Sequence, residues 1–175
     1  MNTKNLVLMA LLVGVGTALY LVIPGINGGM KPDFMLTMMI IGILLFPTVK
    51  ETFLISVATG VLSGLFSTFP GGFVPNVIDK AVTGFVVLAV VLVLRHFIQK
   101  VAVSTVLVGL GTMLSGSVFL SMALALTEVP IDFAVMFATV VLPAVVMNAI
   151  AFVIIYPIIT NLLKRSNFQT SVTRA

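Results

Sequence analysis

Long apolar runs, separated by short clusters of Gly, Pro and charged residues, follow one another along the whole chain. A bilayer core about 30 Å thick is crossed by roughly 20 apolar residues of helix, so each run predicts a membrane helix. The six runs cover residues 5–23, 32–46, 49–67, 79–98, 101–126 and 131–163. The second is short for a crossing, and the sixth is overlong and contains Pro143 and Pro157, so we expect strong tilt or partial spanning. The pattern predicts an all-α integral membrane protein, with residues 1–175 as a single six-helix transmembrane bundle.

Local signals indicate where some of these helices begin. Thr48 stands three residues before Glu51, the spacing of a capping box. Asp79 is well placed to favour the N-terminus of the fourth helix, since acidic residues stabilise that end of the helix dipole. The three methionines of the second run are expected in the membrane core or on the lipid face, at Met35, Met38 and Met39.

Composition supports lipid as the main solvent of the chain. Its 175 residues are 60% hydrophobic and only 8% charged, whereas soluble domains have about 25% charged residues. The basic residues are scattered singly and form no patch of the kind that binds nucleic acid. The absence of cysteine excludes disulfides and thiolate metal sites. We find no catalytic, metal-binding or nucleotide-binding motif, and therefore expect no enzyme, metal or cofactor, and any energised transport would need separate ATPase subunits.

The distribution of basic residues predicts the orientation in the membrane. With a cytoplasmic N-terminus, the opposite side holds only Lys31 and Lys80. The cytoplasmic segments then hold Lys4, Lys50, Arg95, Lys100, Lys164, Arg165 and Arg174. This bias follows the positive-inside rule, and six crossings return the C-terminus to the cytoplasm as well.

Polar residues gather at the predicted outer face, where they could bind a small charged molecule. A zwitterionic amino acid needs a carboxylate for its ammonium, a lysine or helix N-terminus for its carboxylate, and an apolar slot for its side chain. Ordinary interfacial charge, with Lys and Asp paired locally, is the alternative interpretation. The polar candidates are Asn27, Lys31, Asp33, Asn76, Asp79 and Lys80, and the aromatic ones are Phe69, Phe73, Phe119 and Phe133.

Small residues four positions apart mark one face of the first helix, at Ala10, Gly14 and Ala18. Such a face lets a second helix approach closely, because membrane helices associate by packing. The neighbour could be another helix of this chain or a separate membrane subunit.

Two further features have a structural and a functional interpretation each. The fifth helix has a small and polar face, which either packs against a helix or lines a cavity. Asn148 lies deep in the sixth helix, where an amide needs partners, so it either joins helices or contacts a ligand. The residues of the fifth-helix face are Gly109, Thr112, Ser115, Gly116 and Ser117.

Four stretches of the sequence resemble a known family. They are GGMKPDFMLTMMIIGILLFP (residues 28–47), FVPNVIDK (residues 73–80), GTMLSGSVFL (residues 111–120) and LPAVVMNAI (residues 142–150). With the length and helix number, they resemble the tryptophan-transport family TrpP, substrate-binding S components of the energy-coupling factor (ECF) transporters. The resemblance runs from about Lys4 to Arg165.

The resemblance implies a six-helix subunit of the bacterial plasma membrane, with both termini cytoplasmic, that binds tryptophan from outside. S components dock on the transmembrane subunit EcfT, which two cytoplasmic ATPases drive. Docking would use Ala10, Gly14 and Ala18, although this family usually has alanine where Gly14 stands. The absence of tryptophan from the chain agrees with a protein made when that amino acid is scarce.

Within this interpretation each part of the substrate has candidate partners. Its ammonium would bind Asp79 or Asp33, and its carboxylate would bind Lys31 or Lys80. Asn148 and Asn76 would make polar contacts, and Phe69, Phe73 or Phe119 would hold the indole. The alternatives are an S component for another vitamin or amino acid, a facilitator that works without partners, and a membrane scaffold that transports nothing.

Overall fold

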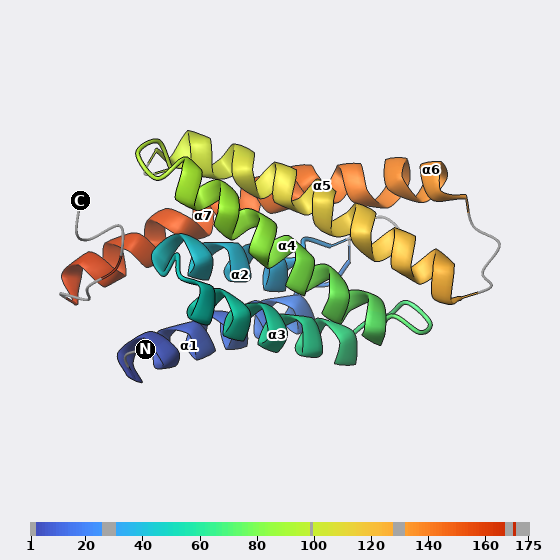
Figure 1. The fold of residues 1–175 in the computed structure, drawn as a ribbon, viewed down its shortest axis with the longest axis horizontal. Helices are drawn as coiled ribbons and strands as arrows, with labels where there is room; N and C mark the ends of the chain where they lie inside the picture. Colours follow the sequence, from blue (N-terminus) through green and yellow to red (C-terminus); the bar gives the residue numbers. More distant parts are fainter. Residues whose placement is uncertain (1–2, 26–30, 99, 128–131, 167–169, 171–175) are drawn as a thin grey trace.

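The fold is a bundle of helices that run along its long axis (Figure 1). It was obtained as a computed structural model that describes residues 3–25, 31–98, 100–127, 132–166 and 170. Every regular element in these ranges is helical, which confirms the all-helical prediction. The elements are α1 (Thr3–Val22), α2 (Phe34–Leu45), α3 (Val49–Leu65), α4 (Phe73–Val93), α5 (Val101–Leu126), α6 (Phe133–Met136), η1 (Phe137–Val141) and α7 (Leu142–Arg165).

The fourth helix begins six residues earlier than the sequence pattern predicts. Residues 73–78 were expected in a loop because Pro75 follows a pair of glycines, but α4 starts at Phe73 with Gly72 as its N-cap. Proline is tolerated in the first turn of a helix, where its missing N–H would be unpaired in any case. The prediction that Asp79 marks a helix N-terminus is therefore wrong. Asp79 and Lys80 instead lie in the second turn of α4, inside the bundle.

The short second helix is the centre of the bundle. All twelve residues of α2 are buried, and α1, α3, α4, α5 and α7 all contact it. A helix enclosed by protein does not have to match the thickness of the bilayer, which accounts for its length. Met35, Met38 and Met39 are therefore core residues, at most 1% exposed, and the lipid-face alternative is wrong for them.

Small residues allow α3 and α4 to pack closely. A Cβ on Gly60 would lie 3.0 Å from the Cα of Val77, and one on Gly64 would lie 3.0 Å from the carbonyl oxygen of Phe73. A third glycine, Gly84 of α4, faces α3 in the same way. The backbones of α3 and α4 therefore approach each other at several levels.

The last helical segment is one continuous rod, Phe133–Arg165. It widens into the π-helical turn η1 just before Pro143, where the N–H of Leu142 bonds the carbonyl of Phe137. Pro157 lies inside α7 without ending it. The two prolines therefore leave the rod unbroken, with a single π-helical turn just before Pro143.

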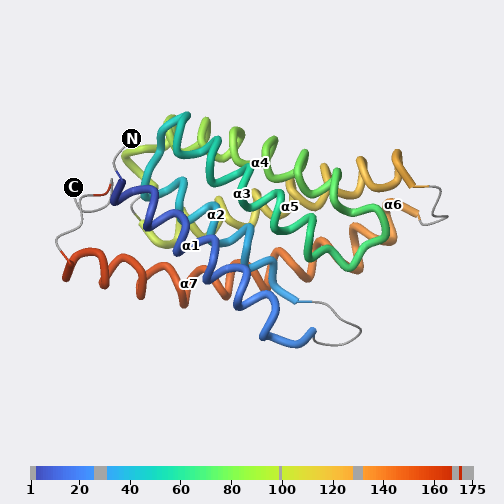
Figure 2. The backbone as a smooth tube through the Cα atoms, turned by 90° about the horizontal axis from the view of Figure 1, so that it is seen from below, coloured from blue at the N-terminus to red at the C-terminus, as the bar shows by residue number. Residues whose placement is uncertain are grey.

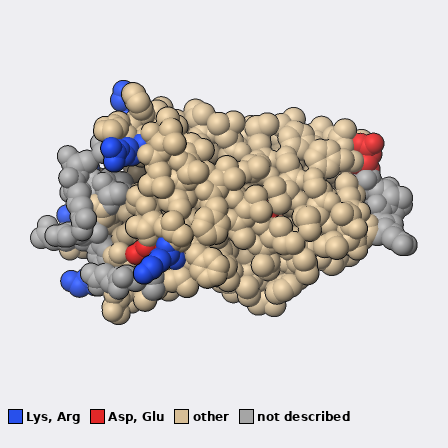
Figure 3. Space-filling view, viewed as in Figure 1, with Lys and Arg blue, Asp and Glu red and all other residues tan. Residues whose placement is uncertain are grey.

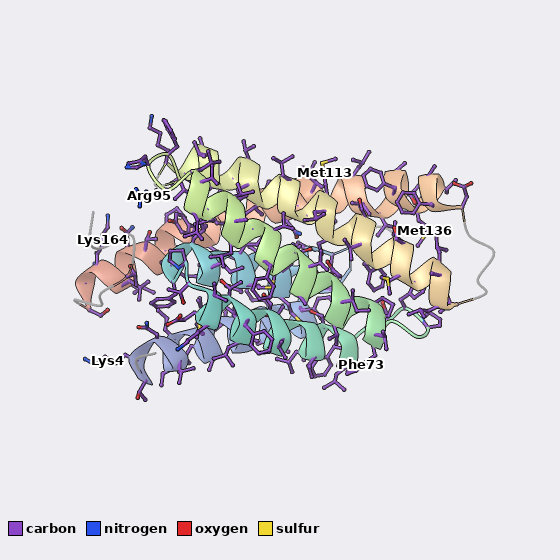
Figure 4. The ribbon with its side chains drawn as sticks, viewed as in Figure 1. Lys4, Phe73, Arg95, Met113, Met136 and Lys164 are labelled. Atoms are coloured by element: carbon purple, nitrogen blue, oxygen red, sulfur yellow. The ribbon has the colours of Figure 1, made fainter. Side chains whose placement is uncertain are left out.

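The outside of the bundle suits a membrane. Four segments are long and apolar enough to cross one, namely Thr3–Val22, Phe73–Val93, Val101–Leu126 and Phe133–Arg165, whereas α2 and α3 are shorter. The flank shown in Figure 3 is almost free of charge. Lys4, Arg95 and Lys164 lie at one end of the bundle (Figure 4), where α1 begins and α7 ends. We call this the basic end; α4 begins at the opposite end.

The predicted capping box at the start of α3 is confirmed in part. Thr48 is the N-cap, and its hydroxyl accepts a hydrogen bond from the N–H of Glu51. The carboxylate of Glu51 does not reach back to the N–H of Thr48, which bonds the carbonyl of Phe46; it accepts from the Thr48 hydroxyl instead.

Candidate functional site

Three charged side chains meet inside the bundle. The ammonium of Lys80 lies 2.7 Å from Oδ2 of Asp79, its neighbour on α4, and 2.9 Å from Oδ2 of Asp33, at the start of α2. We call Asp33, Asp79 and Lys80 the ion cluster. With all three groups ionised it has a net charge of −1. Asp79 is fully buried and Lys80 is only 2% exposed, so this pair lies inside the bundle. Lys80 nevertheless pairs with the Asp next to it in the sequence, as the interpretation of locally paired charges expects.

Hydroxyl groups complete the surroundings of Asp79. Thr83, one turn further along α4, donates a hydrogen bond to Oδ1 at 3.0 Å. Ser115 of α5 donates to Oδ2 at 2.9 Å and also lies 3.2 Å from the Lys80 ammonium. A buried carboxylate is stable only when its lone pairs are satisfied and an opposite charge is near. Asp79 meets both conditions and has no exposed atom left for a ligand.

Asp33 is the accessible member of the ion cluster. As the N-cap of α2 it accepts a hydrogen bond from the N–H of Leu36 at 2.9 Å, which fixes one carboxylate oxygen. The other oxygen faces Lys80, and the side chain is 32% exposed. The side chains of Asp79 and Lys80 are 1% and 3% exposed. A molecule that reaches the cluster from outside the bundle therefore meets Asp33.

Asn148 connects three helices next to the ion cluster. Its carbonyl oxygen accepts the backbone N–H of Asp33 at 2.7 Å, and its amide donates to the hydroxyl of Thr112 at 3.0 Å. Thr112 in turn donates to the carbonyl of Val108 at 2.8 Å. The expectation that Asn148 has partners is confirmed, and these contacts join α7 to α2 and α5. Asn148 thereby also fixes the backbone of Asp33.

The fifth-helix face combines packing and polar roles. Cβ atoms on Gly109 and Gly116 would meet the side chains of Val145 and Val141, so these glycines pack against the last rod. The hydroxyl of Ser117 is satisfied by the carbonyl of Met113 in its own helix. Thr112 and Ser115 supply the polar contacts described above.

Aromatic side chains lie next to the ion cluster, towards the end opposite the basic end. Phe119 follows Ser115 by one turn of α5, and its ring packs edge to face on Phe69, with centroids 5.6 Å apart. On the side of α1, the Lys31 ammonium lies 3.6 Å from the centroid of the Tyr20 ring and donates to the Tyr20 carbonyl at 2.8 Å. Lys31 is partly buried.

The other predicted site residues lie outside this assembly. Asn76 bonds the carbonyl of Gly72 in the preceding turn, Phe73 is 44% exposed beside Gly64, and Phe133 stacks on Phe137. Asn27 lies outside the described residues.

Sequence reasoning missed Tyr20 and Thr83. Nothing in the spacing singles out Tyr20. Thr83 could have been found, because it follows Asp79 by four residues and thus lies on the same face of a helix.

The small residues of α1 face away from the rest of the chain. Ala10, Gly14 and Ala18 are exposed, and a Cβ built on Gly14 meets nothing within 4 Å. It is Gly16 that packs internally, since its Cβ would lie 3.0 Å from Met38 and from the carbonyl of Phe34. The alternative that the predicted small-residue face packs within the chain is therefore wrong.

An apolar exterior, several segments able to span a bilayer and a buried ion cluster together define a multi-pass membrane protein with an internal polar site. Its location is the cell membrane, where such a surface is stable. The family model described as tryptophan transporter TrpP matches residues 2–164, and the chain belongs to this family.

Three relatives are each named probable tryptophan transport protein. The one from Bacillus subtilis is 49% identical, over 97% of this chain and 98% of its own. The protein from Clostridium acetobutylicum is 42% identical, over 89% of this chain and 91% of its own. The Clostridium perfringens protein is 31% identical, over 95% and 96%. No solved structure matches the chain.

Proposed function

We propose that this chain is the tryptophan-binding S subunit of an ECF-type importer. The ion cluster is the observation that supports binding of an amino acid. In it two carboxylates share one lysine, and only Asp33 remains accessible. Family membership and the names of the relatives support tryptophan as the molecule bound.

The geometry favours one member of each candidate pair. The ammonium of the substrate binds Asp33, because a second cation there neutralises the cluster and needs no rearrangement of Asp79. The substrate carboxylate binds Lys31, which is partly exposed. Lys80 is less suitable because it already forms ion pairs with Asp33 and Asp79. The indole packs beside Phe69 and Phe119, since an aromatic edge and face suit a second aromatic ring.

Fluorescence gives a direct test of the substrate, because the chain contains no tryptophan. Added L-tryptophan is the sole indole in the sample, and binding beside apolar rings should shift its emission to shorter wavelength in a saturable manner. Indole-3-propionate and tryptamine, which each lack one charged group, should bind more weakly. Saturable binding of a vitamin, with none of tryptophan, would reject the substrate and leave the S-component class open.

The exposed small-residue face of α1 supports a membrane partner. Ala10, Gly14 and Ala18 leave a stripe where a second helix can approach closely, as docking on EcfT requires. Tryptophan uptake should therefore stop in cells that lack EcfT and its two ATPases. Uptake that persists without them would identify a stand-alone facilitator. If the protein is a scaffold that transports nothing, cells should show no uptake through it. In that case Asp33→Asn should leave growth on limiting tryptophan unchanged.

We further propose that the bundle crosses the membrane six times, with both termini in the cytoplasm. The gathering of Lys4, Arg95 and Lys164 at one end supports this orientation. The chain has no native cysteine, so single cysteines report sidedness directly. In intact cells an impermeant reagent should label Thr68→Cys and spare His96→Cys; the reverse pattern would invert the topology.

A further inference from the structure

The last turn of α1 has a carbonyl group that its own helix cannot satisfy. The N–H four residues after Tyr20 would normally donate to the Tyr20 carbonyl, but that residue is Pro24, which has no N–H. The carbonyl before it, of Leu19, accepts the N–H of Ile23 at 3.0 Å. The Tyr20 carbonyl therefore needs a donor from outside the helix.

Lys31 is that donor. Its ammonium donates to the Tyr20 carbonyl at 2.8 Å, and it also lies 3.6 Å from the centroid of the Tyr20 ring. Figure 2 shows the end of α1 beside the residues that lead into α2. A cation is stabilised both at the C-terminal end of a helix and over an aromatic face. Tyr20 thus holds the cation with its backbone and its side chain together.

This contact lies next to the ion cluster. The hydroxyl of Tyr20 is close enough to Asp33 and Lys80 to interact with their charges, and it shares a hydrogen bond with the side chain of Thr68. Lys31 and Asp33 are two residues apart, which limits the distance between their Cα atoms to roughly 7 Å. The cation held by Tyr20 and the accessible carboxylate of the cluster are therefore neighbours.

The ammonium of Lys31 can still bind a ligand. A lysine has three N–H donors, and the Tyr20 carbonyl takes one of them. Among the described residues Lys31 forms no ion pair, since both ion pairs there belong to Lys80. A free lysine side chain loses rotamer freedom when it binds a ligand, whereas one already held in place has lost that freedom on folding. Holding Lys31 in place therefore strengthens its binding of an anion.

We propose that Tyr20 is a positioning residue, which holds the Lys31 ammonium beside Asp33 so that it binds the carboxylate of an α-amino acid. This inference rests on the proposed function, because it requires the substrate carboxylate to bind Lys31. Loss of the Tyr20 ring should then weaken the binding of ligands that have a carboxylate and spare ligands that have none.

Fluorescence titration of purified Tyr20→Leu with L-tryptophan and with tryptamine tests this role, because tryptamine keeps the indole and the ammonium but has no carboxylate. We expect L-tryptophan to bind roughly 3- to 30-fold more weakly than to the unsubstituted protein, the range of a cation–π contact. Tryptamine should bind equally well to both proteins. Tyr20→Phe, which keeps the ring, should restore most of the affinity for tryptophan. The matched control is Leu21→Ala, at a neighbouring side chain that is 55% exposed, and it should change neither affinity.

A double-mutant cycle with Lys31→Met shows whether Tyr20 acts through Lys31. If it does, Tyr20→Leu should weaken tryptophan binding no further in the Lys31→Met background. Equal weakening of tryptophan and tryptamine by Tyr20→Leu would overturn the proposal, because the ring would then contact the indole or support the fold. Additive losses in the cycle, or unchanged tryptophan affinity of Tyr20→Leu, would overturn it as well.

A second measurement needs no substrate. The rate at which a water-soluble reagent acylates the Lys31 amine, followed by mass spectrometry of the peptide that contains it, reports how firmly that amine is held. Tyr20→Leu should raise this rate about threefold, and Tyr20→Phe should leave it unchanged; equal rates in all three proteins would overturn the proposal. If the unsubstituted protein bound no tryptophan, the proposed function would fail, whereas the acylation rates would still decide whether Tyr20 holds Lys31.

Discussion

Lys80→Met tests the ion cluster most severely, because it removes the one cation that two carboxylates share. Met has a similar length and is apolar, so the space is still filled. What is lost is the contact of the ammonium with Asp79 at 2.7 Å and with Asp33 at 2.9 Å. Asp33 can recruit water because its side chain is 32% exposed, whereas Asp79 remains buried as an unpaired charge.

The magnitude follows from that burial. Removing one partner of a buried ion pair costs about 3–5 kcal/mol. Thr83 and Ser115 still donate to Asp79, so we expect a loss at the lower end, about 3 kcal/mol in the free energy of unfolding. Lys50→Met, at an exposed position near the start of α3, should change that free energy by less than about 0.5 kcal/mol.

Reversible unfolding in mixed detergent micelles, followed by the helical circular dichroism signal, measures these differences. A double-mutant cycle measures the interaction energy between Asp79 and Lys80. Asp79→Asn removes the carboxylate charge that Lys80→Met leaves buried without a cation. The double variant should be more stable than the sum of the single effects predicts, by about 1–3 kcal/mol. Strict additivity, or a Lys80→Met variant as stable as Lys50→Met, would refute the idea that Asp79 depends on Lys80.

Four further substitutions probe other contacts. Gly84→Ala should destabilise the fold by about 1–3 kcal/mol, because its Cβ would overlap the hydroxyl of Ser56; a thermal midpoint equal to that of the unsubstituted protein would argue against the close α3–α4 approach. Gly14→Val should leave folding intact and abolish copurification with EcfT. Gly16→Val, which clashes with α2, should instead lower the thermal midpoint. Equal effects of the two variants in both assays would contradict the assignment of Gly14 to the exposed face of α1 and of Gly16 to the face that packs on α2. Asn148→Leu should lower the unfolding free energy by about 1–3 kcal/mol by unpairing the N–H of Asp33, and an unchanged value in the micelle assay would count against this link.

The sequence predicted those features that depend on local pattern. Apolar runs located the helices, and the second run correctly predicted a short helix. An amide in hydrocarbon needs partners, which correctly predicted that Asn148 is hydrogen-bonded. The N-cap role of Thr48 followed from local spacing, because it depends on neighbours a few residues away.

Features that depend on tertiary register could not be predicted in the same way. That Lys80 reaches Asp33 depends on how α4 crosses the start of α2, and no pattern along the chain specifies this. Asp79 is buried because α4 begins at Phe73 and continues through Pro75. The sequence pattern had instead placed Pro75 in a loop before the helix. The role of Gly16, two residues from Gly14, was likewise set by which face of α1 meets α2.

The central claim is that Asp33 recognises the ammonium of tryptophan, and the affinity of purified Asp33→Asn for L-tryptophan tests it most directly. Asn can still cap α2, and Lys80 keeps its ion pair with Asp79. The fold should therefore persist, as circular dichroism can confirm. Loss of a charge-assisted hydrogen bond costs about 1.5–3 kcal/mol, which corresponds to an affinity roughly 10- to 100-fold weaker. Asp132→Asn, an exposed carboxylate at the start of α6, should bind tryptophan as the unsubstituted protein does. Equal affinity of Asp33→Asn and the unsubstituted protein would contradict the claim.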